Sequence, residues 1–347
     1  MMKIGLVGYQ GSGKSTLFEW LTGVPADPAL AHTSQHAMAP VGDPRVEPLC
    51  KVYSPKKVTL AALELVDTAG LSRTHEGNAV RLAEIREAGC LVLVVGAFER
   101  GSDPLAEVDG FADDFLLADL ETVSGRIERL RESVKKPRPN RDAELAELAA
   151  LEPLLKALES GTPLSAAGMS DEQLKVTRSF RLLTEKPRFV VFNVADDEAD
   201  GKRLVDALAA RTPPLCGVAV PARLELELSR MPQDERDAFR REMGIASSDR
   251  DGLLHALLDV SRQMLFFTAG EKEVRTWMLR QGGTALDAAA GIHTDLARGF
   301  IRAEVMKCDD LIRLGSEREI KAHGLVRQEP KDYVVQGGDI LLIRFSV

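Results

Sequence analysis

The chain contains 347 residues, of which 44% are hydrophobic and 28% are charged, and its formal net charge at pH 7 is −8. This composition is that of a globular protein with a sizeable core and room for two or three domains. No apolar run is long enough to span a membrane, and the negative charge argues against bulk nonspecific binding to nucleic acid. We therefore expect a cytoplasmic protein that has neither a membrane nor DNA as a partner.

A strand-like stretch at residues 3–7 leads directly into a glycine-rich run from Gly8 to Ser15, which fits the phosphate-binding pattern G-x-x-x-x-G-K-[ST]. Backbone amides of such a loop point at phosphates, the lysine reaches the β and γ phosphates, and the serine hydroxyl can ligate Mg²⁺. A helix expected over residues 15–21 adds the positive end of its dipole. The run predicts a purine-nucleotide site with Mg²⁺. The expected contact residues are Gly8, Gln10, Gly11, Ser12, Gly13, Lys14, Ser15 and Thr16.

Four later runs read as short buried strands alternating with helical segments, a pattern that indicates a doubly wound α/β domain. The strands are expected at residues 63–66, 91–95, 188–192 and 217–220, and a helix is expected at residues 79–88. Ahead of these strands, Thr33 is the candidate for the switch I threonine that senses Mg²⁺ and the γ-phosphate. Thr22 and Ser34 compete with it for this role.

A second motif, running from Asp67 to Gly70, follows the strand at residues 63–66 and matches the D-x-x-G pattern of switch II in GTPase-type P-loop proteins. The aspartate can hold the Mg²⁺ shell through water, while the Gly70 amide can sense the γ-phosphate and transmit its loss to the next loop. The predicted metal-binding residues are Ser15, Thr33 and Asp67. The predicted catalytic residues are Lys14 and Gly70.

Small GTPases usually place a water-orienting Gln directly after this glycine, but Leu71 stands here and cannot hydrogen-bond a water molecule. We therefore expect slow intrinsic hydrolysis. His75 and Glu76 in the following loop either substitute for the missing group or are ordinary solvated residues.

Base recognition is expected from Asn193, Val194 and Asp196 after one strand, and from Ala222 and Arg223 after the next. The usual guanine motif is N-K-x-D, in which the aspartate accepts hydrogen bonds from guanine and the lysine stem packs along the base. Val194 replaces that lysine, so guanine preference is unsupported even though Asp196 keeps the carboxylate.

A helical segment interrupts the α/β pattern. Apolar residues step by three and four along a heptad stripe: Leu116, Leu120, Val123, Ile127, Leu130 and Val134. A proline-containing break at residues 135–140 and a second leucine-rich helix, with Pro153 as a point of interruption or restart, complete a predicted coiled-coil-like hairpin. A capping box at residues 170–173 opens a helix that returns the chain to the sheet. The stripe is either the packing seam of the hairpin or a site for a partner helix.

Zinc is not expected. The four cysteines are scattered along the chain without the spacing of a metal site or redox pair. His32 and His36 stand four residues apart, but their segment has no helix pattern and no matching third ligand.

The order of these parts resembles the YchF family, a branch of the Obg-related P-loop GTPases. The resemblance rests on the leucine after D-x-x-G, the inserted hairpin, the run Asp43-Pro44-Arg45 and a C-terminal block similar to the family's TGS domain, a β-grasp fold. The matching runs in that block are residues 266–277, 291–295, 298–305 and 332–339. The resemblance implies a discontinuous G domain over residues 1–112 and 184–264, a helical hairpin over 113–183 and a β-grasp domain over 265–347.

The resemblance further implies a cytoplasmic ATPase that associates with ribosomes, in which N-x-x-E replaces the guanine motif and ATP is preferred. This chain departs from the family at three positions. Asp196 stands in place of that glutamate, which keeps GTP open as an alternative. Gly11 stands in place of an asparagine that helps hold K⁺ in related GTPases, and Leu93 stands in place of a histidine proposed to aid catalysis.

The leading hypothesis is a Mg²⁺-dependent nucleotide switch that hydrolyses ATP, or GTP, slowly and has the ribosome or ribosomal RNA as its partner. The alternative is a ribosome- or RNA-binding module that nucleotide merely stabilises, with a contact face formed by His293, Arg298, Arg302 and Lys307. A small-molecule kinase is a third reading, but it leaves the D-x-x-G motif unexplained. The sequence does not indicate the oligomeric state.

Overall fold

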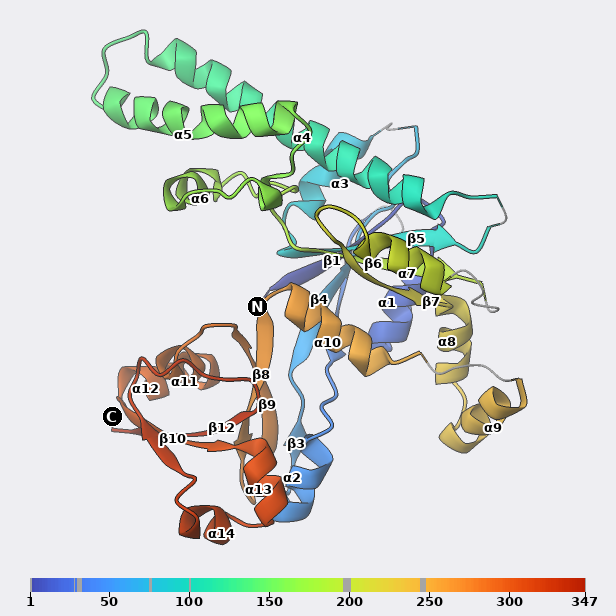
Figure 1. Cartoon of the computed structure of the whole chain (residues 1–347), viewed down its shortest axis with the longest axis vertical. Coiled ribbons are helices and arrows are strands. Elements are labelled where there is room, and N and C mark those ends of the chain that lie inside the picture. Colours follow the sequence, from blue (N-terminus) through green and yellow to red (C-terminus); the bar gives the residue numbers. More distant parts are fainter. Residues whose placement is uncertain are drawn as a thin grey trace. The chain divides into compact units, whose positions relative to one another are not determined.

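The computed structural model describes residues 2–27, 29, 33–74, 77–99, 101–195, 201–243 and 248–346. Contacts divide the chain into two compact units. The first unit joins Met1–Ala37 to Glu64–Ser248, and the second joins Met38–Leu63 to Asp249–Val347. Figure 1 shows the elements of both units in the colours of the sequence. The expected three-domain division draws its boundaries differently, because its G domain includes residues 38–63 and 249–264 of the second unit, and it stays a prediction.

The first unit is built on a six-stranded sheet with the order β2-β4-β1-β5-β6-β7. Its strands are β1 (Lys3–Val7), β2 (Gln35–Pro40), β4 (Ala62–Asp67), β5 (Cys90–Ala97), β6 (Arg188–Val194) and β7 (Cys216–Val220). From β4 to β7 the neighbouring strands run parallel, so their carboxyl ends meet at one edge. The buried run from Cys90 to Gly96 reflects helices on both faces of a parallel sheet. The α/β fold expected from the sequence is confirmed.

The helices of the first unit pack against this sheet and against one another. They are α1 (Lys14–Thr22), α3 (Asn78–Ile85), α4 (Pro104–Ser133), α5 (Arg141–Glu159), α6 (Asp171–Thr177), α7 (Gly201–Ala209), α8 (Ala222–Ser229) and α9 (Gln233–Met243), with a 3₁₀ turn at Leu164–Ala166. Phe111 of α4 and Leu208 of α7 share one hydrophobic cluster with Val190 and Phe192 of β6.

The longest helix, α4, begins nine residues before the expected start at residue 113. Asp103 caps it by accepting a hydrogen bond from the Ala106 amide at 3.1 Å, and Pro104 occupies the first turn, where no amide donor is needed. Three residues of the heptad stripe, Val123, Ile127 and Leu130, are buried in one cluster with leucines of α5. Figure 1 shows α5 lying along this part of α4, and α5 continues through Pro153.

The second unit contains another six-stranded sheet, with the order β11-β10-β12-β8-β9-β3. Its strands are β3 (Val58–Thr59), β8 (Gln263–Ala269), β9 (Val274–Arg280), β10 (Phe300–Lys307), β11 (Arg327–Glu329) and β12 (Asp339–Phe345). Its helices are α2 (Val46–Tyr53), α10 (Arg250–Val260), α11 (Ala285–Ile292), α12 (Thr294–Arg298), α13 (Cys308–Leu314) and α14 (Glu317–Ala322). Three of its strand pairs are antiparallel: β8 with β9, β10 with β12 and β10 with β11.

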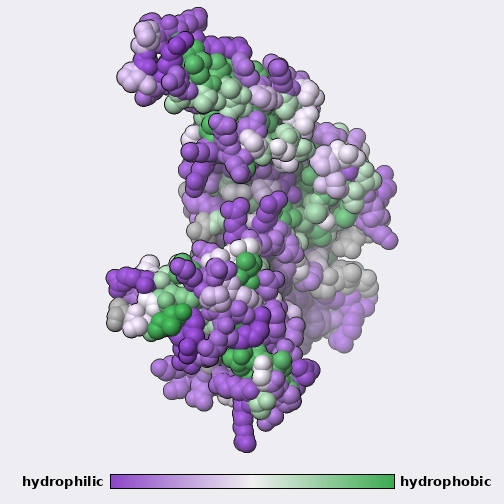
Figure 2. Space-filling view, turned by 60° about the vertical axis from the view of Figure 1, so that its left-hand side comes forward, coloured by the Kyte–Doolittle hydropathy of each residue, from purple (hydrophilic) through white to green (hydrophobic). Residues whose placement is uncertain are grey.

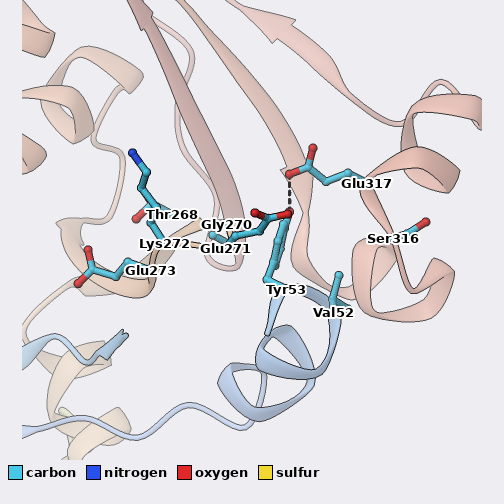
Figure 3. Close-up of a pocket in the computed structure, with 10 residues that line it drawn as sticks. Val52, Tyr53, Thr268, Gly270, Glu271, Lys272, Glu273, Ser316 and Glu317 are labelled. Carbon is cyan, nitrogen blue, oxygen red and sulfur yellow. Dashed lines mark hydrogen bonds between the residues drawn. The ribbon is translucent and has the colours of Figure 1, made fainter. Parts of the chain in front are cut away.

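The second unit includes residues 38–63, and the segment between β2 and β4 makes three kinds of contact there. β3 pairs in parallel with β9, and Leu49 of α2 lies in one core cluster with Phe267 and Ile340. The Tyr53 hydroxyl donates to a Glu317 carboxylate oxygen at 2.9 Å. Figure 3 shows this bond at the edge of a hollow of about 650 Å³ between α2, the β8–β9 turn and the start of α14. Burial raises the pKa of Tyr53, so the phenol stays a donor at neutral pH.

On the face shown in Figure 2, hydrophilic residues predominate and hydrophobic residues form small separate groups. Among the described residues, no helix combines the length and the apolar character that crossing a membrane requires.

Candidate functional site

The glycine-rich loop connects the carboxyl end of β1 to the start of α1, at the edge of the sheet where the parallel strands end. Gly11 and Gly13 have φ values of 81° and 92°, a conformation that side chains rarely adopt. At Gly13 a Cβ atom would also collide with the side-chain amide of Asn193. The glycines therefore set the loop's shape and admit a side chain from β6.

Lys14 is held inside this loop. Its Nζ atom donates to the carbonyl oxygens of Gly8 and Tyr9, each at 3.1 Å, and the residue is 7% exposed. Burial lowers the pKa of Lys14, and the nearby Asp67 carboxylate opposes that shift. Backbone carbonyls thus hold the cation at the place where the loop would receive phosphates.

Ser15 and Asp67 form the next contact of the site. The Ser15 hydroxyl donates to Asp67 Oδ2 at 2.6 Å. The other carboxylate oxygen, Oδ1, is buried without a hydrogen-bond partner in the described part of the chain. Burial raises the pKa of Asp67, while the Ser15 hydrogen bond and the charge of Lys14 lower it. An unpartnered carboxylate oxygen beside a serine hydroxyl is a donor set that suits Mg²⁺.

The D-x-x-G segment is joined to the glycine-rich loop by two backbone hydrogen bonds. The Leu71 amide donates to the Gly8 carbonyl, and the Gln10 amide donates to the Leu71 carbonyl, both at 3.0 Å. A Cβ atom at Gly70 would lie 3.1 Å from Lys14 Nζ, so a glycine there lets the segment approach the lysine closely. A movement of the D-x-x-G segment is therefore transmitted to the glycine-rich loop, and the reverse also holds.

The Leu71 side chain is fully buried and packs with Leu82 and Phe111 in the core of the first unit. Leu93 on β5 is 1% exposed and lies in the same cluster. Both leucines are therefore core residues, and Tyr9 of the glycine-rich loop belongs to the same cluster.

Asn193 connects two loops at the end of β6. Its Nδ2 donates to the Ser12 carbonyl at 3.1 Å, and its Oδ1 accepts from the Ala222 amide, also at 3.1 Å. The glycine-rich loop and the start of α8, two of the segments singled out in the sequence, therefore meet at this side chain.

Comparisons with known proteins identify the family. Residues 3–123 match a family model described as 50S ribosome-binding GTPase, and residues 264–346 match the YchF GTPase C-terminal model, described as a protein of unknown function (DUF933). The chain is 34% identical to the ribosome-binding ATPase YchF of Haemophilus influenzae and 33% identical to that of Bacillus subtilis, over 99% of this chain and 99% of each relative. The chain belongs to the YchF family.

The fold agrees with this assignment. The solved structure of the Schizosaccharomyces pombe YchF GTPase matches it with a TM-score of 0.86 at 25% identity, over 99% of this chain and 97% of that one. The first unit therefore contains the P-loop GTPase domain, and the second contains the YchF C-terminal domain.

Within this YchF frame the remaining predicted residues lie in different surroundings. Val194 is 6% exposed and packs in the core, whereas Arg223 is exposed and pairs with Glu227 at 3.1 Å. Thr33 lies at an exposed bend ahead of β2, and its role on Mg²⁺ stays a prediction. His36 contacts the Glu64 carboxylate at 3.0 Å. Predictions for His32, His75, Glu76 and Asp196 fall outside the described residues.

The sequence analysis missed an aromatic contact of the loop. Tyr9 stacks on Phe111 of α4, and the guanidinium of Arg73 lies 5.4 Å from the centre of the Tyr9 ring. Arg73 also donates to a carboxylate oxygen of Glu107 at 3.0 Å. An aromatic residue at a variable position of the phosphate-binding pattern was the only signal, and the pattern itself attaches no role to that position.

Proposed function

We propose that this YchF-family chain binds a purine nucleotide with Mg²⁺ at the glycine-rich loop, hydrolyses it slowly and acts as a nucleotide-dependent switch. The observation that carries the proposal is the Ser15–Asp67 pair with its unpartnered oxygen, next to a lysine held on two carbonyls. Ser15 and Asp67 would hold the metal, with Thr33 as the candidate third group. Bound Mg²⁺ supplies neutralisation of charge on the β and γ phosphates.

Each loop residue has a distinct part in this function. Lys14 exchanges the Gly8 and Tyr9 carbonyls for phosphate oxygens, and the Gly70 amide is placed to donate to the γ-phosphate end. Loss of that phosphate releases Gly70, and the change passes along the chain into the loop that leads to α3. Because Leu71 and Leu93 are buried, neither can orient an attacking water, which supports slow hydrolysis.

ATP is the proposed nucleotide, with GTP as the alternative. The curated relatives are named ATPases, whereas the matching model of the nucleotide-binding half is named a GTPase. Val194 is buried and offers no cationic stem to stack on guanine, which favours ATP. Gly11 lacks a side chain that could hold K⁺, so we expect similar hydrolysis rates in KCl and NaCl.

The ribosome or ribosomal RNA is the proposed partner, because the relatives are named ribosome-binding ATPases. We accordingly propose a cytoplasmic protein, whose helical pair over residues 113–183 and β-grasp-like C-terminal domain over residues 265–347 make the partner contacts. A second candidate function is a nucleotide-stabilised binding module with negligible turnover. The burial of Leu71 and Leu93 favours it, because neither side chain can orient a water molecule for hydrolysis. Multiple-turnover hydrolysis that rises when ribosomes are added favours the switch, and its absence favours the module.

Calorimetric titration with ATP and GTP analogues in Mg²⁺ buffer tests the nucleotide site. Lys14→Ala should weaken binding at least tenfold, while Lys156→Ala, a change of an exposed lysine on α5, should leave it unchanged. If Lys14→Ala bound the nucleotide analogues as tightly as the unmodified chain does, the assignment of the nucleotide site would be wrong. Tighter binding of the GTP analogue would make this member a GTPase.

A further inference from the structure

A second hollow in the first unit lies where the C-terminal end of α3 meets the segment after α6. It has a volume of about 660 Å³. Its charged and aromatic lining residues are Arg86, Glu87, Lys175, Arg178, Phe180 and Arg181. Four of these residues carry positive charge and one carries negative charge, in a chain whose net charge is −8.

The charges in the hollow are only partly compensated. Arg181 pairs with Glu87, and Arg86 pairs with Asp119. Lys175 and Arg178 are exposed, and neither has an acidic partner among the residues that the structure describes. They stand three residues apart at the end of α6, so they project from the same side of one helical turn. The hollow therefore presents two uncompensated cations side by side.

Arg86 and its surroundings make the floor of the hollow rigid. One guanidinium nitrogen of Arg86 donates to Asp119 at 2.7 Å and to the Arg181 carbonyl at 3.3 Å, and the other donates to the Ala118 carbonyl at 3.0 Å. Asp119 is fully buried and also accepts hydrogen bonds from the backbone amides of Leu183 and Thr184. Arg86 is thus fixed to α4 and to the chain that enters β6.

Two further features support a ligand that is anionic and partly aromatic. Arg181 has a φ of 50°, an uncommon value outside glycine, which turns its carbonyl towards Arg86. Phe180 adds a half-buried ring to the lining, and unpaired bases stack on such rings.

We propose that this hollow binds the phosphate backbone of single-stranded RNA, with Lys175 and Arg178 on phosphates and Phe180 under a base. Cations supply sequence-independent affinity for phosphates, and an aromatic ring supplies stacking. This inference rests on the proposed ribosome association, because that association makes RNA the expected partner. The C-terminal cations are less suited to the role, because Lys307 pairs with Asp339 at 2.7 Å and Arg298 with Asp295 at 3.0 Å.

The position of the hollow links RNA to the nucleotide site. Arg86 directly follows Ile85, the last residue of α3, and α3 is the helix that follows the D-x-x-G loop. A ligand at Arg86 therefore contacts the C-terminal end of α3, the helix that would respond to the γ-phosphate through the D-x-x-G loop. Linkage requires that if nucleotide changes the RNA affinity, RNA changes the nucleotide affinity by the same factor.

Fluorescence anisotropy with a labelled single-stranded RNA oligonucleotide and the full chain tests the proposal. Replacing Lys175 and Arg178 together by Glu should weaken binding at least tenfold. Replacing both by Ala should lower the slope of log affinity against log salt by about 1.4, the value for two single-strand phosphates. The matched control replaces Lys156 and Arg241, exposed cations on α5 and α9, by the same residues and should bind as the unmodified chain does.

Three outcomes would overturn the assignment. Equal losses in the test and control pairs would mean that only net charge matters. Full competition by millimolar inorganic phosphate would mean a small-anion site. Retained RNA affinity with lost co-sedimentation with ribosomes would mean that the hollow contacts an acidic protein. Titration of the same variants with an ATP analogue separates these results from failure of the nucleotide site, and Phe180→Ala probes stacking without changing charge.

Discussion

The ring of Tyr9 in the glycine-rich loop stacks on the ring of Phe111 in α4, with centroids 4.4 Å apart and planes inclined by 18°. The Tyr9 hydroxyl also lies within hydrogen-bond distance of an Asp114 carboxylate oxygen, at 3.4 Å. Burial first, and the neighbouring Asp114 second, raise the pKa of Tyr9 to about 12, so the phenol stays neutral. The loop that would hold phosphates is therefore fixed to the long helix that carries α5.

Gly110 makes room for this contact, and Gly125 on the same helix provides a comparison. A Cβ atom at position 110 would lie 3.1 Å from the Tyr9 hydroxyl, whereas a Cβ atom at position 125 would meet nothing within 4 Å. Gly125→Ala should raise the free energy of unfolding by about 1 kcal/mol through helix propensity. Gly110→Ala should gain less or lose stability, because the tyrosine must move. Thermal and urea unfolding of both variants measures the difference, and equal gains would contradict the proposed crowding.

Asp67→Asn should separate stability from function. The variant keeps an oxygen that accepts from Ser15 but removes a charge whose burial is unfavourable. The free energy of unfolding without Mg²⁺ should therefore stay equal or increase. Affinity for an ATP analogue in Mg²⁺ should fall at least tenfold, while affinity measured in EDTA should change little. An equal loss in both buffers would mean that Asp67 does not act through the metal.

The raised pKa of Asp67 predicts a pH dependence of metal binding. A carboxyl group with a raised pKa is protonated at a higher pH than an ordinary aspartate, and only its ionised form binds Mg²⁺. The Mg²⁺-dependent part of nucleotide affinity should therefore decline as pH falls, starting above the usual range for aspartate. In the metal-free protein the sign is opposite: the protonated group stabilises the fold at low pH, and this contribution is lost as pH rises through the folded pKa. Asp67→Asn should flatten both profiles.

The lowered pKa of Lys14 predicts that nucleotide binding also depends on pH in the alkaline range. Burial lowers its pKa, so without nucleotide the lysine loses its proton at a lower pH than an exposed lysine does. Phosphates favour the charged form, so binding at alkaline pH should take up a proton and weaken as pH rises. Titrations in buffers of different ionisation enthalpy detect that proton. Lys14→Arg, which stays charged, should bind without proton uptake, and uptake that persists in this variant would assign the proton to another group.

The nucleotide motifs could be recognised in the sequence because their information is local. Lys14 and Ser15 stand at a fixed spacing from Gly8, and Asp67 directly follows a buried strand. The structure brings these three residues together. Long-range contacts were harder to predict. The pairing of β3 with β9 places residues 38–63 in the second unit, and it involves only two residues on the β3 side, too few for a periodic signal.

Other details depended on contacts that no sequence pattern encodes. The heptad stripe marked only the part of α4 that packs on α5, so the earlier turns beginning at Pro104 were missed because they pack against the sheet core. Tyr9 was not singled out because its partner Phe111 is about a hundred residues away in the sequence. The leucine that replaces the usual catalytic glutamine looked like a missing active-site group, whereas the structure places it in the core.

That burial leads to a prediction for Leu71→Gln, the change that would restore the residue found in small GTPases. The side chain at position 71 is fully buried against Leu82 and Phe111, while its backbone bonds to Gly8 and Gln10 fix its direction. A glutamine there would bury an unsatisfied amide and would not reach a water near the γ-phosphate. We expect a loss of about 2–5 kcal/mol in the free energy of unfolding and no gain in hydrolysis. Leu93→Gln, in the same cluster on β5, should behave alike. A stable Leu71→Gln variant with faster single-turnover hydrolysis would show that the segment rotates this side chain towards the nucleotide during the reaction.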